Sequence, residues 1–146
     1  MKIIVAVDLN WGIGCNGELL QRISDDAFIF RSKTTGKVVV MGRETFDSLP
    51  GKKPLKDRTN IVLTRNTEYK DARFIVANSI DQTLEILKKY DSDDIYIIGG
   101  QMIYNQFLPY CNEAYVTKIN KEHIADKHFP NLDDNRDWIL VENGEE

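Results

Sequence analysis

The sequence has little of several features that mark particular classes of protein. Its 146 residues include only two cysteines and two histidines, with no CxxC pair and no histidine at metal-ligand spacing from a cysteine. This scarcity excludes a disulfide-stapled scaffold and a zinc module, and it is typical of a reducing cytoplasm. No apolar run approaches the ~20 residues that a membrane span requires. The apolar run over residues 3–7 ends at Asp8, which is too early for a signal peptide.

The sequence also lacks an excess of positive charge. It has 19 lysines and arginines against 23 aspartates and glutamates, which gives a formal net charge of −4. An acidic chain is a poor general binder of nucleic acid or of anionic membranes. The content of 42% hydrophobic and 29% charged residues is ordinary for a soluble globular protein. We therefore expect one domain over residues 1–146, in the cytoplasm, with neither a nucleic-acid nor a membrane partner.

Short apolar runs alternate with helical patterns along the chain. Buried strands are predicted at residues 3–7, 37–41, 59–64, 73–77 and 94–98. Helices are predicted at residues 24–35, 42–49 and 101–108, and another begins with a capping box at Ser79 and Gln82. Residues 113–120, whose alternation would suit an antiparallel strand, and residues 138–142 are expected to form further strands. The alternation of strands and helices predicts a parallel sheet covered by helices on both faces.

Residues 8–22 separate the first strand from the first helix and show no periodicity. This segment contains Gly12, Gly14 and Gly17. About fifteen residues without regular structure are uncommon inside a domain unless they form a functional loop. We therefore expect a functional loop here.

Glycines and arginines follow three of the predicted strands. The segments are Gly42-Arg43, Thr64-Arg65 and Gly99-Gly100. Parallel sheets bind ligands at the carboxyl ends of their strands, where glycine and helix N-termini let the backbone approach an anion. The two arginines could clamp a phosphate monoester, which favours NADP(H) over NAD(H). In the alternative interpretation the glycines only cap helices and the arginines are solvated; neither GxGxxG nor GxxxxGK[ST] is present.

Asp26 is a second candidate for a functional residue. It precedes Phe30 by four positions, so the two side chains share a face of the predicted helix. A carboxylate facing an apolar cleft would have a raised pKa and could hold a proton donor in place. The pattern alone fits better with an exposed aspartate that stabilises the helix dipole, as Asp25 does. The two histidines, His123 and His128, are more typical of a solvated loop than of a metal site.

Taken together, these features resemble dihydrofolate reductase over residues 2–138. The matching segments, in family order, are IVAVD (4–8), GIG (12–14), Asp26, Phe30, VMGRETFDS (40–48), RTNIVLT (58–64), IIGG (97–100), QMIYNQFLP (101–109), YVT (115–117) and HFP (128–130). Each segment is weak evidence by itself, whereas the ordered set is specific.

The resemblance implies an α/β, dihydrofolate-reductase-like three-layer fold with a mostly parallel central sheet and an antiparallel C-terminal edge. It implies reduction of 7,8-dihydrofolate to 5,6,7,8-tetrahydrofolate with NADPH as cofactor, by hydride transfer to pterin C6 and protonation at N5. Asp26 would be the catalytic carboxylate, bound to the pterin 2-amino group and N3 and hydrogen-bonded to Thr117. The loop over residues 8–22 would be a lid that excludes water. The family also has a cis peptide between its paired glycines.

The resemblance also implies the residues that bind the two small molecules. An apolar slot for the pterin would consist of Ile4, Val5, Phe30, Leu49 and Ile98. Arg58 would bind the α-carboxylate of the glutamate tail, and Thr117 completes the substrate-binding set. The cofactor-binding residues would be Ala6, Ile13, Gly14, Leu19, Gly42, Arg43, Thr45, Leu63, Thr64, Arg65, Gly99, Gly100, Gln101, Met102, Ile103 and Tyr104. No metal site is expected, and antifolates are expected as inhibitors.

Two departures from the family pattern carry expectations of their own. Leu20-Gln21 replaces the usual Pro-Trp of the lid, so Gln21 would take over a hydrogen-bonding role near the pterin. The family closes its sheet with a C-terminal hairpin, and we expect this hairpin to be missing here, although Asn143-Gly144 is a hairpin-turn signal. We expect a monomer whose exposed sheet edge could support association.

Two other functions are compatible with parts of the pattern. One is the related NADPH-dependent pyrimidine reductase of riboflavin synthesis, which shares the fold and the cofactor groove. Arg58 argues for folate, since a ribityl pyrimidine has no glutamate tail. The other is a non-catalytic nucleotide-binding fragment, inactive because the C-terminal hairpin is absent.

Overall fold

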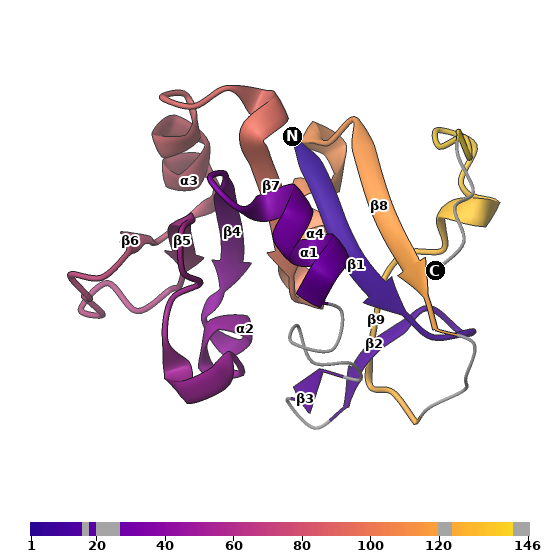
Figure 1. The fold of residues 1–146 in the computed structure, drawn as a ribbon, viewed down its shortest axis with the longest axis horizontal. Helices are drawn as coiled ribbons and strands as arrows, with labels where there is room; N and C mark the ends of the chain where they lie inside the picture. Colours follow the sequence, from indigo (N-terminus) through magenta and orange to yellow (C-terminus); the bar gives the residue numbers. More distant parts are fainter. Residues whose placement is uncertain (16–17, 20–26, 120–123, 142–146) are drawn as a thin grey trace.

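The computed structural model describes residues 1–15, 18–19, 27–119 and 124–141, which are arranged around a six-stranded sheet (Figure 1). The strand order is β6-β5-β4-β7-β1-β8, and every neighbouring pair is parallel. The strands are β1 (Lys2–Val7), β4 (Val38–Gly42), β5 (Thr59–Leu63), β6 (Ile75–Ala77), β7 (Ile95–Gly99) and β8 (Glu113–Lys118). The prediction of a parallel sheet is confirmed, and so are its five buried strands, within one or two residues at each end.

Helices cover both faces of the sheet. They are α1 (Ala27–Thr34), α2 (Arg43–Asp47), α3 (Ile80–Leu87) and α4 (Gln101–Phe107). Successive side chains of a strand point to opposite faces, so the strand residues divide between two apolar clusters. The α1-side core contains Ile4, Phe30, Val39, Met41, Phe46, Leu49, Val62, Tyr96 and Ile98. The α4-side core includes Val5, Val38, Val40, Ile97 and Phe107, and α3 and α4 pack there. Figure 1 shows α1 in front of the sheet and α4 behind it.

A second, three-stranded sheet lies beyond the end of β1. Its strands, β2 (Gly12–Cys15), β3 (Glu18–Leu19) and β9 (Lys127–His128), pair antiparallel in the order β3-β2-β9. The expectation of a segment without regular structure over residues 8–22 is therefore wrong for its described part. The strands are short, and β2 pairs with a segment far along the chain, so no local periodicity marks them. Asp8 ends β1, and its buried carboxylate accepts the backbone N–H groups of Asn10 and Gly12, both at 2.8 Å.

Two expectations about the C-terminal third are wrong. β8 runs parallel to β1 rather than antiparallel, because α4 returns the chain to the starting end of the sheet before β8 begins. Residues 138–141 form no strand; Ile139, Leu140 and Val141 are 83%, 73% and 93% exposed. β-branched residues favour a strand only where a neighbour pairs with them. The antiparallel pairing therefore lies in the small sheet and not at the edge formed by β8.

The start of α3 follows its predicted capping signal, whereas α2 has no side-chain cap and ends at Asp47, two residues before the predicted end. Ser79 Oγ accepts the backbone N–H of Gln82 at 3.0 Å and begins α3 as predicted. The reciprocal half of the capping box differs, because Gln82 Oε1 accepts the N–H of Asn78, at 2.6 Å, instead of that of Ser79. The expected start of the first helix at Ser24 lies outside the described residues. That helix ends at Thr34, two residues before Gly36 (φ +78°).

Four short 3₁₀ turns complete the fold: η1 (Pro50–Lys52), η2 (Ser92–Asp94), η3 (Leu108–Tyr110) and η4 (Leu132–Asp134). α4 ends one residue earlier than predicted because η3 tightens the chain around Pro109. Among the described residues, no helix combines the length and the apolar character that crossing a membrane would require.

Candidate active site at the carboxyl edge of the sheet

Two neighbouring strands both end in a glycine at the carboxyl edge of the sheet. β4 ends at Gly42 and β7 at Gly99, and Met41 is paired with Gly99. A Cβ atom added to Gly42 would lie 3.1 Å from Ile103 Cγ1 and 3.9 Å from the Gly99 carbonyl oxygen. Gly99 has φ +118°, and a Cβ there would lie 3.1 Å from the Tyr104 ring. A side chain at either position would therefore crowd or strain this edge.

The chain turns directly from β7 into α4 at the paired glycines. The peptide bond between Gly99 and Gly100 is cis, as the resemblance implied. The Gly100 carbonyl accepts the N–H of Tyr104 at 2.8 Å. A Cβ on Gly100 would meet only Thr45 Oγ1, at 3.5 Å. The first residues of α2 and α4 therefore face each other across an edge that carries almost no side-chain bulk.

Arg43 lies at this edge, at the start of α2. Its Nε atom is buried, and it is the one buried side-chain nitrogen or oxygen of the described residues without a hydrogen-bond partner. The carboxylate of Asp47 lies 3.6 Å from that Nε, which is within ion-pair range but too far for a hydrogen bond. The guanidinium carbon lies 3.9 Å from the centre of the Tyr69 ring. Tyr69 is outside the predicted set, because it lies on another segment and no local pattern marks the contact.

The other predicted cofactor-binding residues are distributed around the same edge. Arg65 is exposed, and Thr64 Oγ1 accepts the N–H of Asn66 at 3.2 Å. The Gln101 side chain accepts the backbone N–H of His128 at 2.7 Å and so links α4 to β9. Met102 is 58% exposed, whereas Ile13 and Ile103 are buried. The remaining positions are Ala6 on β1, Gly14 on β2, Leu19 on β3 and Leu63 at the end of β5.

Four of the five residues predicted to form the apolar slot lie together. Ile4, Phe30, Leu49 and Ile98 all belong to the α1-side core and are between 3% and 6% exposed. The structure separates Val5 from them, because its side chain packs into the α4-side core on the opposite face. Adjacent residues of one strand cannot both face the same side, so Val5 adjoins the slot through its backbone only.

Arg58 lies beside this slot at the start of β5. Its guanidinium carbon is 5.7 Å from the centre of the Phe30 ring, and its Nε donates to Thr34 Oγ1 at 3.2 Å. Nη1 donates to the Lys56 carbonyl at 2.9 Å. Burial lowers the pKa of Arg58, and the positive charge of Arg31 lowers it further. An anion bound here would offset both effects, so the position suits a ligand carboxylate.

Tyr104, on α4, makes a hydrogen bond to β1. Its hydroxyl is buried and donates to the carbonyl of Ile4 at 2.9 Å. Burial raises the pKa of this phenol, so it remains a hydrogen-bond donor across the physiological range. The side chain lies in the α4-side core and against Phe129, at an edge-to-face centroid distance of 5.0 Å. Tyr104 therefore fixes α4 against β1 beside the slot.

Asp26, the predicted catalytic residue, lies outside the described residues, as do Leu20, Gln21 and His123. Thr117, its expected partner, is half-buried on β8 and paired with Ala6 of β1. Within the described part of the chain, no group of three or more histidine, cysteine, aspartate or glutamate residues could hold a metal ion.

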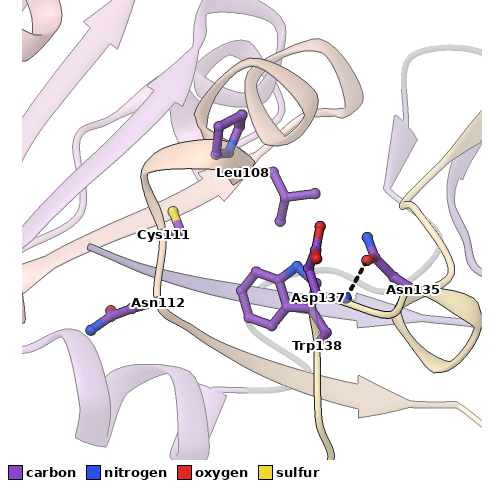
Figure 2. Close-up of a pocket in the computed structure, with 7 residues that line it drawn as sticks. Leu108, Cys111, Asn112, Asn135, Asp137 and Trp138 are labelled. Atoms are coloured by element: carbon purple, nitrogen blue, oxygen red, sulfur yellow. Dashed lines mark hydrogen bonds between the residues drawn. The ribbon is translucent and has the colours of Figure 1, made fainter.

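A cavity of about 360 Å³ lies away from these residues, between η3 and the segment that follows η4 (Figure 2). It is lined by Leu108, Pro109, Cys111, Asn112, Asn135, Asp137 and Trp138. Burial raises the pKa of the Cys111 thiol to about 11, and its Sγ donates to the Phe107 carbonyl. A thiol held protonated is a poor nucleophile, and none of the predicted site residues lines this cavity.

Comparison with known proteins gives one consistent result. A family model described as "Dihydrofolate reductase" matches residues 1–146. The dihydrofolate reductase of Bacillus subtilis (strain 168) is 33% identical over 141 residues, which are 97% of this chain and 81% of that protein. The enzyme of Staphylococcus haemolyticus is 36% identical over 148 residues, covering 99% of this chain and 85% of its own. Among solved structures, dihydrofolate reductase from Enterococcus faecalis complexed with NADP(H) and RAB-propyl is similar with a TM-score of 0.79 and 33% identity, over 90% of this chain and 77% of that one.

Proposed function

The chain belongs to the dihydrofolate reductase family, and we propose which of its residues perform the reaction. The protein is an NADPH-dependent oxidoreductase that reduces 7,8-dihydrofolate to 5,6,7,8-tetrahydrofolate. When bound, NADPH supplies the hydride that reduces C6 of the pterin. The observation that supports this assignment to residues is the meeting of the Gly42 and Gly99 backbones on a sheet whose α1-side core includes Phe30, with Arg58 beside that ring.

The carboxyl edge of the sheet fits a dinucleotide phosphate. The backbones of Gly42, Gly99 and Gly100 would lie against the cofactor. Cβ atoms added at these positions would occupy the space through which the cofactor reaches the backbone or would contact neighbouring atoms. The Arg43 side chain is 40% exposed, so its guanidinium could donate to a phosphate oxygen, and its Nε has no hydrogen-bond partner among the described residues. Arg65 adds a second positive charge, which favours NADPH over NADH. The other proposed cofactor-binding positions, named above, lie on the elements around these five residues.

The substrate would occupy the slot on the α1 side of the sheet. Ile4, Phe30, Leu49 and Ile98 would enclose the pterin and exclude water, and Arg58 would bind the α-carboxylate of the glutamate tail. The carboxylate of Asp26, with Thr117 as its hydrogen-bond partner, would hold the 2-amino group and N3 and would favour protonation at N5. As the single ionisable group that would face the pterin, this carboxylate would set the pH dependence of the reaction.

Activity is tested by mixing the purified chain with NADPH and dihydrofolate and following the loss of NADPH absorbance. We expect steady oxidation that requires both compounds. NADPH binding without oxidation would contradict the function and would leave a nucleotide-binding fragment. The pyrimidine reductase of riboflavin synthesis is not favoured by the comparisons, and oxidation with its ribityl pyrimidine in place of dihydrofolate would reverse that judgement.

Asp26→Asn tests the assignment of the catalytic carboxylate. The amide can bind the pterin but cannot support protonation at N5, so we expect kcat at neutral pH to fall by about 10²- to 10⁴-fold. NADPH affinity should be unchanged in a fluorescence titration. Asp25→Asn is the matched control, because it removes the same charge one residue earlier. Equal activities of the two variants would contradict the role of Asp26.

The remaining assignments concern the partners and the compartment of the protein. We propose that the chain acts as a monomer in the cytoplasm and that antifolates bind in the pterin slot. The low cysteine content and the NADPH requirement support the compartment. β8 is one of the two outer strands of the described sheet, and association through its open edge would appear as concentration-dependent mass in solution.

A further inference from the structure

The Arg43 guanidinium lies on the face of an aromatic ring. Its central carbon is 3.9 Å from the centre of Tyr69, a distance typical of a close cation–π contact. Such a contact uses the flat face of the guanidinium and leaves its N–H groups, which point outward in the plane, for hydrogen bonds. The buried Nε has no hydrogen-bond partner among the described residues. Tyr69 thus holds Arg43 without occupying its donors, and the Asp47 carboxylate, 3.6 Å from Nε, pairs with the charge but makes no hydrogen bond to it.

The Tyr69 ring is itself fixed by a series of aromatic contacts that returns to α2. Tyr69 stacks on Phe74 at a centroid distance of 6.2 Å, and Phe74 packs against Phe46 at 4.7 Å. Phe46 is 2% exposed in the α1-side core and lies on the same helix as Arg43. The rings therefore connect the backbone of α2 to the guanidinium by a second route, in addition to the Arg43 side chain.

Hydrogen bonds restrain the segment that carries Tyr69, between β5 and β6. The Tyr69 N–H donates to the Asn66 carbonyl at 3.1 Å, and Asn66 Oδ1 accepts the N–H of Glu68 at 3.0 Å. Asn78 Nδ2 donates to the carbonyl of Thr64 at 2.9 Å and to that of Asn66 at 3.3 Å. These contacts fix the turn before Tyr69, so the ring is placed by the fold.

We propose that Tyr69 is a positioning residue that holds Arg43 for the phosphate monoester of the cofactor and thereby favours NADPH over NADH. This inference rests on the proposed function, because it takes Arg43 to bind that phosphate. A free arginine side chain loses considerable rotamer entropy when it binds an anion. A guanidinium already stacked on Tyr69 has lost part of that freedom before the cofactor arrives, so binding costs less.

The test compares two nucleotides that differ only in the additional phosphate monoester on the 2′-oxygen. Adenosine 2′,5′-bisphosphate and adenosine 5′-monophosphate are titrated calorimetrically into the full chain and its variants. We expect Tyr69→Leu to weaken binding of the bisphosphate about three- to tenfold, the range of one partly exposed cation–π contact. Binding of the monophosphate should change less than twofold. Tyr69→Phe keeps the ring and should retain the affinity of the wild type for both nucleotides.

Arg43→Met provides the second arm. It should reduce the preference for the bisphosphate to the part that Arg65 supplies, and adding Tyr69→Leu should then have no further effect on that preference. Equal weakening of both nucleotides by Tyr69→Leu would indicate a general structural role and would overturn the inference. Retention of the full preference in Tyr69→Leu would overturn it as well.

The same titrations separate this inference from the proposed function. If the wild-type chain prefers the bisphosphate and Tyr69→Leu reduces that preference, the role of Tyr69 is supported even where dihydrofolate fails to oxidise NADPH. If the wild-type chain binds the two nucleotides equally, the role of Tyr69 is overturned even where the enzyme is active.

Discussion

Arg58 is a single residue whose surroundings favour the binding of an anionic ligand. Its charge lies beside the Phe30 ring, and burial together with the nearby charge of Arg31 lowers its pKa by more than the charge of Asp57 raises it. The hydrogen bonds to Thr34 and Lys56 fix the guanidinium but bring no negative charge to it. The side chain therefore suits the carboxylate of a glutamate tail.

Replacement of this side chain tests its role. In Arg58→Met, loss of the charged hydrogen bonds should raise KM for dihydrofolate by about 10- to 100-fold, with kcat changed little. Binding of a pterin without the glutamate tail should be unaffected. Arg136→Met, which removes an exposed arginine on the segment after η4, is the control. A similar loss of affinity for the tail-less pterin would contradict this assignment.

Individual site residues could be predicted from the sequence only where they stand at the end of a predicted strand or the start of a predicted helix. Gly42, Arg43 and Gly99 follow predicted strands, so their convergence at one edge could be inferred before the structure. The contact between Arg43 and Tyr69 could not, because it joins two segments through a turn whose geometry depends on Asn66 and Asn78. Asp26 was proposed on the family resemblance, since its local pattern fits a helix-dipole aspartate better.

At the scale of elements, α4 does most to shape the site. It follows directly from the cis Gly99-Gly100 peptide, and Tyr104 on its first turns donates a buried hydrogen bond to the Ile4 carbonyl of β1. The Tyr104 ring also lies so close to Gly99 that a side chain at position 99 would crowd it. One helix therefore connects the glycine edge to the strand that carries the pterin slot.

Tyr104→Phe should measure the strength of this link. The substitution leaves the Ile4 carbonyl buried without its donor, so the free energy of unfolding should fall by about 1–3 kcal/mol. Urea denaturation followed by circular dichroism gives the value. Tyr110→Phe serves as the control, since Tyr110 is 52% exposed and its hydroxyl can bond to water. Equal stabilities of the two variants would show that the hydrogen bond contributes nothing.

Element types were easier to predict than their directions and partners. The apolar runs of β1, β4, β5 and β7 are continuous, and burial on both faces of a parallel sheet requires this pattern. β8 is an outer strand whose four central residues are all half-buried, so the alternation in its sequence did not indicate its direction. β2 and β9 depend on pairing between distant segments, which no window of the sequence contains.

At the scale of the whole molecule, the two faces of the sheet differ: one carries the larger apolar core and the other carries the proposed substrate site. The α4-side core is the larger cluster and holds most of the buried strand residues, together with α3 and α4. The α1-side core is smaller and contains the residues proposed for the pterin slot. Gly42 and Gly99 lie where the paired strands β4 and β7 end. The proposed cofactor site, at these glycines, is therefore next to the proposed substrate site. This division brings the two reactants together without a separate binding domain.

A structure of the chain with NADPH and a folate would decide whether Asp26 is the group that acts on the pterin. The measurement is the distance from the Asp26 carboxylate to the pterin N3 and 2-amino group. We predict that both lie within hydrogen-bond distance, about 2.7–3.2 Å, with the pterin ring between Phe30 and Ile98. A pterin bound in this slot with the Asp26 side chain turned to solvent would contradict the proposed mechanism.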